Sequence, residues 1–187
     1  MATTPEWQLG RYLALVQLLA RRMRLDPQLQ KRFDASDLVQ ETMLNATANL
    51  EACRALTEAE LVRWLQQILT NVYLDRLDGG RAQKCDVRLE RSLPGMLADS
   101  TARLEAFLED RRQDSPSAAA QRRETLARLA EAVEQLEEDQ RDVVILRLLM
   151  DTPVAQIAEE LGRTEKSVAG LLRRGKRKLR ALLADLA

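Results

Sequence analysis

Apolar residues recur every three or four positions in several stretches of the chain, which is the spacing of one helix face. The first stretch, residues 9–23, ends at Asp26-Pro27, because proline cannot continue a helix. The next follows Asp34-Ala35-Ser36, which can cap a helix over about residues 37–50. The pattern therefore predicts two helices near the N-terminus.

A third helix is predicted to begin at a capping box. Thr57 is its N-cap, and Glu60 stands three residues later, where its carboxylate can return to the Thr57 backbone. An apolar face follows before Gly79-Gly80 ends the element: Leu61, Trp64, Leu65, Ile68, Leu69 and Val72. Three helices in this space predict a first helical domain, residues 1–80.

The helical pattern weakens over residues 81–120. Pro94-Gly95 and Asp114-Ser115-Pro116-Ser117 are turn or loop signals, and only a short helix around Leu104 is indicated. We interpret this segment as a flexible linker. A helical stripe resumes beyond it, so residues 121–187 are expected to form a second domain. The predicted fold is all-α, with two small helical domains joined by that linker.

The most specific local pattern lies between Pro153 and Lys178. Thr152-Pro153 predicts an N-cap followed by proline in the first helical turn, and a second helix is expected from Glu165. A helix-turn-helix needs a small residue where its helices touch, a glycine with positive φ and a β-branched residue that packs the second helix back. Those three positions are filled by Ala158, Gly162 and Val168.

The charges of the chain balance overall but are separated along it. There are 29 Lys and Arg residues and 29 Asp and Glu residues. Residues 131–142 hold six acids and one arginine, whereas residues 163–180 hold eight basic residues and one acid. A basic second helix can lie in the DNA major groove, with Arg at guanine edges and Lys at phosphates. An ordinary helical hairpin with a solvated basic face is the alternative.

Several chemistries are excluded by composition. The chain has no histidine, so neither a Ser-His-Asp nor a Cys-His system is possible, and no imidazole can bind a metal. Cys53 and Cys85 are too far apart for a C-x-x-C pair. Aromatic residues are only 3%, which favours helices over a sheet, and a chain that is 45% hydrophobic can bury a core. We expect no catalytic residue, no metal site and no cofactor.

The N-terminal residues lack a basic region followed by an apolar one, so no signal peptide is expected. No apolar stretch approaches the roughly 20 residues of a membrane span. We therefore expect a cytoplasmic protein without a membrane span.

Three motifs follow one another along the chain. They are Asp37-Leu38-Val39-Gln40-Glu41-Thr42, then residues 64–71 with Asp75, then residues 139–144 with the helix-turn-helix pattern. Together they resemble the small sigma-70-type RNA polymerase sigma factors, the extracytoplasmic-function (ECF) group. The resemblance implies a bacterial protein that binds core RNA polymerase through its beta and beta-prime subunits and directs promoter recognition and DNA melting. It also implies an anti-sigma factor as a further partner.

The resemblance assigns polymerase docking to the first motif, on the clamp helices of the largest subunit. The residues agree with an exposed polar ridge, because Asp37, Gln40 and Glu41 stand at i, i+3 and i+4 while Leu38 and Val39 face inward. A merely solvated helix face is the alternative.

The same resemblance assigns the minus-ten element to the second motif. Asn71 matches the position that lines a pocket for an extruded base, where a side-chain amide can both donate and accept hydrogen bonds. Residues 49–57 would complete this pocket. Arg63, Arg76 and Arg81 are expected to contact backbone phosphates.

The minus-thirty-five element is assigned to the helix-turn-helix. Ala169 and Gly170 occupy positions where many relatives carry a basic residue and a serine, so base reading is expected one turn further along. The predicted contacts are Arg163, Thr164, Lys166, Ser167, Arg173, Arg174, Lys176 and Lys178. A helix-turn-helix regulator that never enters polymerase, and a helical adaptor that binds only protein, remain as alternative functions.

Overall fold

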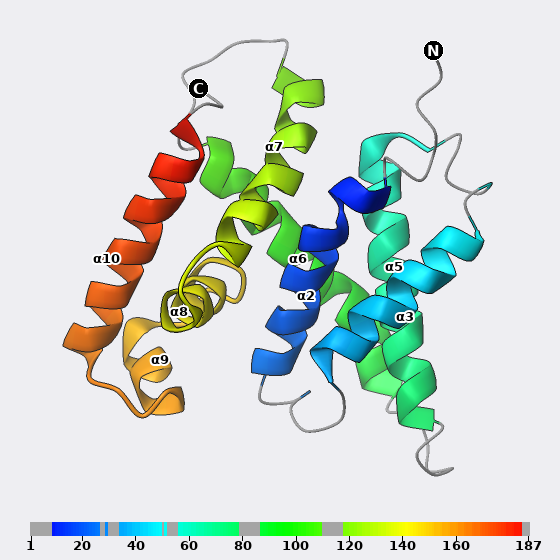
Figure 1. Cartoon of the computed structure of the whole chain (residues 1–187). Helices are drawn as coiled ribbons and strands as arrows, with labels where there is room; N and C mark the ends of the chain where they lie inside the picture. The colour runs from blue at the N-terminus through cyan, green and yellow to red at the C-terminus, as the bar shows by residue number, and fades with distance from the viewer. Residues whose placement is uncertain are drawn as a thin grey trace. The chain divides into compact units, whose positions relative to one another are not determined.

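The computed structural model describes residues 9–26, 29, 34–49, 51, 56–78, 87–109 and 118–184. Regular structure within these ranges is helical, which confirms the all-α prediction (Figure 1). The helices are α2 (Leu13–Leu25), α3 (Ala35–Ala48), α5 (Glu58–Asp78), α6 (Val87–Glu109), α7 (Ala118–Glu134), α8 (Glu138–Leu148), α9 (Val154–Glu160) and α10 (Glu165–Leu182). The chain divides into two compact units, residues 1–99 and 100–187, so the boundary falls within the segment predicted as a linker.

The first unit is built around α3, which packs against both α2 and α5 (Figure 1). Its largest fully buried side chains come from these three helices, from the first half of α6 and from Leu29: Leu15, Leu18, Leu19, Met23, Leu29, Leu38, Leu65, Leu69, Tyr73, Leu93 and Leu97. The buried Gln66 Nε2 donates to the Leu97 carbonyl oxygen at 3.2 Å, so α6 is joined to α5 by a hydrogen bond as well as by apolar contact.

Side-chain caps position the helices that carry the two N-terminal motifs. The Asp34 carboxylate accepts from the backbone N–H groups of Ser36 and Asp37, at 2.7 and 3.3 Å, and starts α3 two residues before the predicted position. The predicted capping box is confirmed, because Glu60 Oε2 accepts from both the backbone N–H and the hydroxyl of Thr57, each at 2.7 Å. These bonds from Thr57 lower the pKa of Glu60 and favour its charged form.

Helix α6 is much longer than the short helix indicated around Leu104. It spans 23 residues and contains Pro94. Its buried leucines, Leu93, Leu97, Leu104 and Leu108, recur four, seven and four residues apart, and thus lie on one helix face. Burial of this face outweighs the turn tendency of Pro94-Gly95, so the predicted turn is replaced by a helix.

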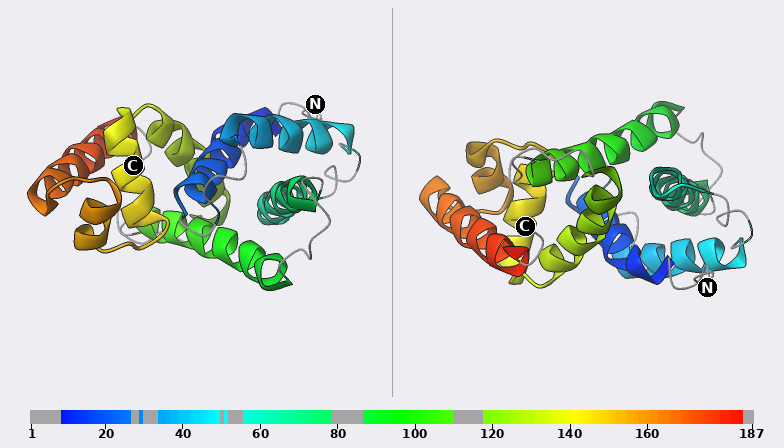
Figure 2. Two further views of the ribbon diagram at one scale, coloured as in Figure 1. Left: turned by 90° about the horizontal axis from the view of Figure 1, so that it is seen from below. Right: turned by 90° about the horizontal axis from the view of Figure 1, so that it is seen from above.

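The second unit contains α7 to α10, with α10 packed on α7, α8 and α9 (Figures 1 and 2). Arg141 holds the turn between α7 and α8. Its Nη2 donates to the carbonyl oxygens of Glu134 and Leu136, at 2.7 and 3.0 Å, and its Nη1 lies 3.0 Å from the Glu134 carboxylate. The guanidinium therefore satisfies carbonyls that the end of α7 leaves without helical partners.

Helices α8 and α10 are in close contact at Gly175. A Cβ atom at this position would lie 2.8 Å from Val144 Cγ2, closer than real Cβ contacts, and 3.6 Å from the Gln140 carbonyl oxygen. Gly170 differs, since its nearest neighbour would be the end of the flexible Arg174 side chain at 3.4 Å. Helix packing therefore explains Gly175 but not Gly170.

Candidate nucleic-acid and protein interfaces

The helix-turn-helix is formed by α9, residues 161–164 and α10. Gly162 adopts φ +61°, and the Arg163 N–H donates to the Ala158 carbonyl oxygen at 2.8 Å, which closes the turn. Ala158 and Val168 are buried between the helices. The three predicted packing positions are thus confirmed.

The cap predicted for α9 is wrong by one residue. Pro153 is the N-cap, and it has no side-chain cap bond. Thr152 is instead buried one position earlier, where its N–H donates to the Leu146 carbonyl oxygen at 3.0 Å. Thr152 is therefore part of the turn after α8, and the cap of α9 lies one residue later. At the start of α10, Thr164 Oγ1 accepts from the Ser167 N–H at 3.2 Å.

One face of α10 is open to solvent and carries two of the predicted DNA contacts, Lys166 and Arg173. Its exposed members at helical spacing are Lys166, Ala169, Arg173, Arg177 and Arg180. Arg174 is also exposed, whereas Lys176 and Lys178 are half-buried. Arg177 was not in the predicted contact set, although its four-residue spacing from Arg173 places it on the same face. The exposed face can present arginines to a DNA groove or to its phosphates.

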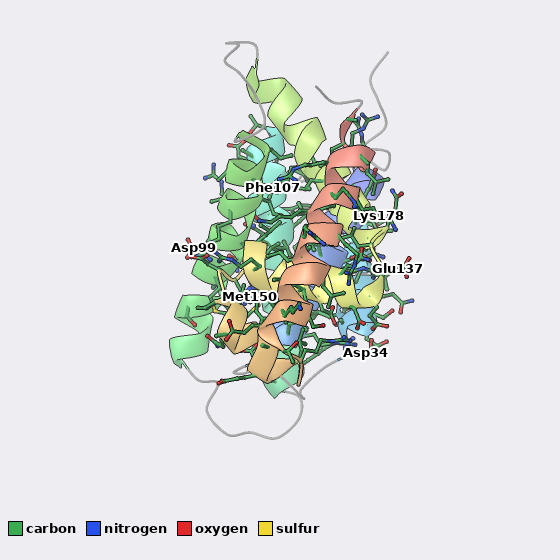
Figure 3. All side chains as sticks on the ribbon, turned by 90° about the vertical axis from the view of Figure 1, so that its left-hand side faces the viewer. Asp34, Asp99, Phe107, Glu137, Met150 and Lys178 are labelled. Carbon is green, nitrogen blue, oxygen red and sulfur yellow. The ribbon has the colours of Figure 1, made fainter. Side chains whose placement is uncertain are left out.

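Two predicted DNA contacts are already paired with acids at the start of α8. Arg163 Nη2 lies 2.6 Å from Asp139 Oδ2. Lys178 Nζ lies 3.9 Å from Glu137 Oε1 (Figure 3). The acidic and basic segments seen in the sequence therefore face each other within the second unit. Sequence reasoning identified both segments but missed their pairing, because the Asp139 and Arg163 positions are 24 residues apart.

The predicted docking ridge is exposed on α3. Asp37 and Gln40 face solvent and Glu41 is partly exposed, while Leu38 and Val39 are buried as expected. Leu44 lies on the same face and is 63% exposed, among the few large apolar side chains so placed in the described ranges. It was missed because an apolar residue at helical spacing is normally assigned to the core.

Arg76 is on α5, as Arg63 is, but its side chain reaches across to α3. Its Nη2 is 2.7 Å from Glu41 Oε2 and donates to the Asp37 carbonyl oxygen at 3.2 Å. Its Nη1 lies 3.9 Å from Asp37 Oδ2. The structure thus brings a predicted phosphate contact together with two residues of the predicted docking ridge.

Two other residues predicted for the minus-ten element share an exposed face of α5. Arg63 and Asn71 are both exposed and stand two helical turns apart. Between them, Gln67 Nε2 donates to Asn71 Oδ1 at 2.8 Å and orients the Asn71 amide. Arg81 and residues 50 and 52–55 of the predicted pocket loop lie outside the described residues, as do Cys53 and Cys85.

Within the described ranges, no cluster of three or more acidic or thiol side chains is arranged to hold a metal ion. In the same ranges, no helix is long and apolar enough to cross a membrane.

These features define a helical protein of two units, the second of which carries a DNA-binding type of helix-turn-helix. The chain belongs to the sigma-70 family, in its ECF group. The model of Sigma-70 region 2 matches residues 9–82, that of Sigma-70 region 4 matches residues 126–179, and together they cover more than half of the chain.

The chain is also similar to a curated ECF sigma factor from Mycobacterium tuberculosis. The ECF RNA polymerase sigma factor SigG is 31% identical over 187 residues in the CDC 1551/Oshkosh strain, and the SigG of strain H37Rv matches equally. The alignment takes in 91% of this chain but 47% of SigG, so the chain spans about half the length of these relatives.

Proposed function

We propose that this protein is an RNA polymerase sigma factor, which binds the core enzyme and directs promoter recognition and DNA melting. The observation that carries this proposal is the presence of both sigma-70 regions in one chain, each on a helical unit. A helix-turn-helix regulator outside polymerase would explain the second unit but not the first. In this role the protein performs no catalysis of its own.

Core polymerase would bind the α3 ridge of Asp37, Gln40 and Glu41. Exposed carboxylate and amide groups can accept hydrogen bonds and pair with basic residues of a partner. Leu44, one turn further along, adds an apolar contact to this polar surface, and apolar anchors within polar rims are typical of energetic centres at interfaces. An anti-sigma factor would be a further partner that competes for the polymerase-binding surfaces.

DNA would contact both units. The exposed face of α5, with Arg63 and Asn71, would take the non-template strand of the minus-ten element, and Arg81 would extend it. The helix-turn-helix would take the minus-thirty-five duplex through its exposed face, with Arg173 and Arg174 at base edges and Lys176 and Lys178 at phosphates. The same surface includes Arg163, Thr164, Lys166 and Ser167 at the turn and the start of α10.

Co-purification with core polymerase tests the proposal. Asp37→Ala combined with Gln40→Ala removes exposed polar groups without opening the core, so the fold should survive while the yield of complex falls. Leu44→Ser should lower the yield independently. Wild-type yields for both variants would refute docking through α3, and a wild-type chain that never co-purifies would favour the regulator.

In vitro transcription then tests promoter function. Purified core polymerase with the chain should initiate from a subset of a randomised promoter library. Initiation that depends on the chain, with shared upstream and downstream elements among the selected promoters, is the expected result. An absence of selected elements would contradict promoter recognition.

A further inference from the structure

Arg76 on α5 contacts α3 through all three nitrogen atoms of its guanidinium. Its Nε and Nη2 each lie 2.7 Å from Glu41 Oε2, and Nη2 also donates to the Asp37 carbonyl oxygen at 3.2 Å. The Asp37 carboxylate lies 3.9 Å from Nη1. The partners are 35 and 39 residues away along the chain, so this contact depends on the packing of α5 against α3.

The surroundings of Arg76 favour a fixed contact over a mobile surface arginine. Its side chain is only 31% exposed, whereas those of Glu41 and Asp37 are 43% and 63% exposed. The arginine side chain is therefore more buried than the two carboxylates, which remain partly open to solvent. To reach a phosphate it would have to leave one carboxylate and one carbonyl oxygen without their present donor, and such a loss opposes the exchange.

We propose that Arg76 is a positioning residue for the polymerase-docking surface and is not a phosphate contact. Asp37 and Glu41 stand one turn apart on α3, where two like charges repel each other. A guanidinium between them offsets this repulsion and holds the Glu41 carboxylate in one orientation. Binding then requires less ordering of the ridge when the partner arrives.

This inference rests on the proposed function, because it takes the α3 ridge as the contact for core polymerase. It also makes a distinction between arginine and lysine. A phosphate contact needs mainly a positive charge, which Arg76→Lys retains. The contact of Arg76 with Glu41 and Asp37 needs a planar guanidinium that reaches a carboxylate and a carbonyl oxygen together. Lysine cannot provide this geometry.

The test compares Arg76→Lys and Arg76→Gln with Arg63→Gln, a matched control on the exposed face of the same helix. Two quantities are measured on the full chain. The first is the affinity for core polymerase, obtained by competition with labelled wild-type chain. The second is the salt dependence with which the complex, at saturating core, binds a single-stranded minus-ten oligonucleotide.

We expect both Arg76 variants to weaken core binding by about three- to fivefold, the upper part of the range available to a partly exposed ion pair. Their salt slopes should match the wild type. Arg63→Gln should leave core affinity unchanged and reduce the slope by roughly 0.7, the value for one lost contact to a single strand. Circular dichroism of each variant would verify that the helices are intact.

Wild-type core affinity for Arg76→Lys, together with a reduced salt slope for Arg76→Gln, would overturn the inference and restore Arg76 to the phosphate contacts. Failure of the premises has different signatures. If docking through α3 is wrong, the Asp37→Ala and Gln40→Ala double variant itself binds core polymerase with wild-type affinity. If the proposed function is wrong, the wild-type chain does not bind core polymerase at all.

Discussion

Replacement of Gly175 by alanine tests how tightly the second unit is packed. The new Cβ would lie 2.8 Å from Val144 Cγ2. Val144 is fully buried and β-branched, so its χ1 rotamer in α8 is nearly fixed and the methyl group cannot easily turn away. The helices must therefore separate slightly, and such overpacking typically costs about 1–3 kcal/mol.

A second effect has the opposite sign. Alanine is favoured over glycine inside a helix by about 1 kcal/mol, so the net destabilisation by Gly175→Ala should be about 0–2 kcal/mol. Gly170→Ala on the same helix has the same gain in helix propensity, and its Cβ would meet only the flexible end of the Arg174 side chain. The difference in unfolding free energy between the two variants should then equal the packing cost alone, about 1–3 kcal/mol.

Urea denaturation followed by far-ultraviolet circular dichroism measures this difference. The Gly175→Ala variant should unfold at lower urea concentration than Gly170→Ala, without a change in the slope of the transition. Combination with Val144→Ala provides a second check, because it removes the methyl group that the new Cβ would meet. The double variant should be more stable than the sum of the single effects. Equal stabilisation by both alanines, or strict additivity with Val144→Ala, would refute the close packing.

The remaining predictions concern DNA and can be tested by titration at several salt concentrations. Asn71→Ala should relax preference at one minus-ten position in a promoter library, and unaltered start-site selection would remove Asn71 from the base pocket. Arg173→Ala should reduce the binding free energy for the preferred duplex by about 1–3 kcal/mol and change it little for other sequences. Lys176→Ala should weaken binding to all sequences alike and reduce the salt slope by roughly one unit. If the two variants behave identically, α10 contributes charge rather than sequence reading. Asp139→Asn should release Arg163 from its ion pair, raise duplex affinity for every sequence and steepen the salt dependence; unchanged binding would show that Arg163 makes no phosphate contact.

Local sequence was sufficient for several features whose interacting groups are neighbours in the chain. The Thr57 and Glu60 capping box was predicted from two residue types at a three-residue spacing, and its hydrogen bonds are present. The helix-turn-helix was equally accessible, because the positive φ of Gly162 and the burial of Ala158 and Val168 follow from a turn of fixed length. These features depend on a few consecutive residues, so composition and spacing predict them directly.

Contacts between distant segments were decided only by the tertiary structure. Sequence reasoning grouped Arg76 with Arg63 because both are cations on one helix, yet packing of α5 on α3 turns Arg76 toward Glu41. It likewise placed Arg163 among free DNA contacts, although the fold brings Asp139 beside it. A side chain's type states what it can bind, but which partner it meets depends on the relative position of helices that are far apart in the chain. Residue spacing along a single helix does not predict that relative position.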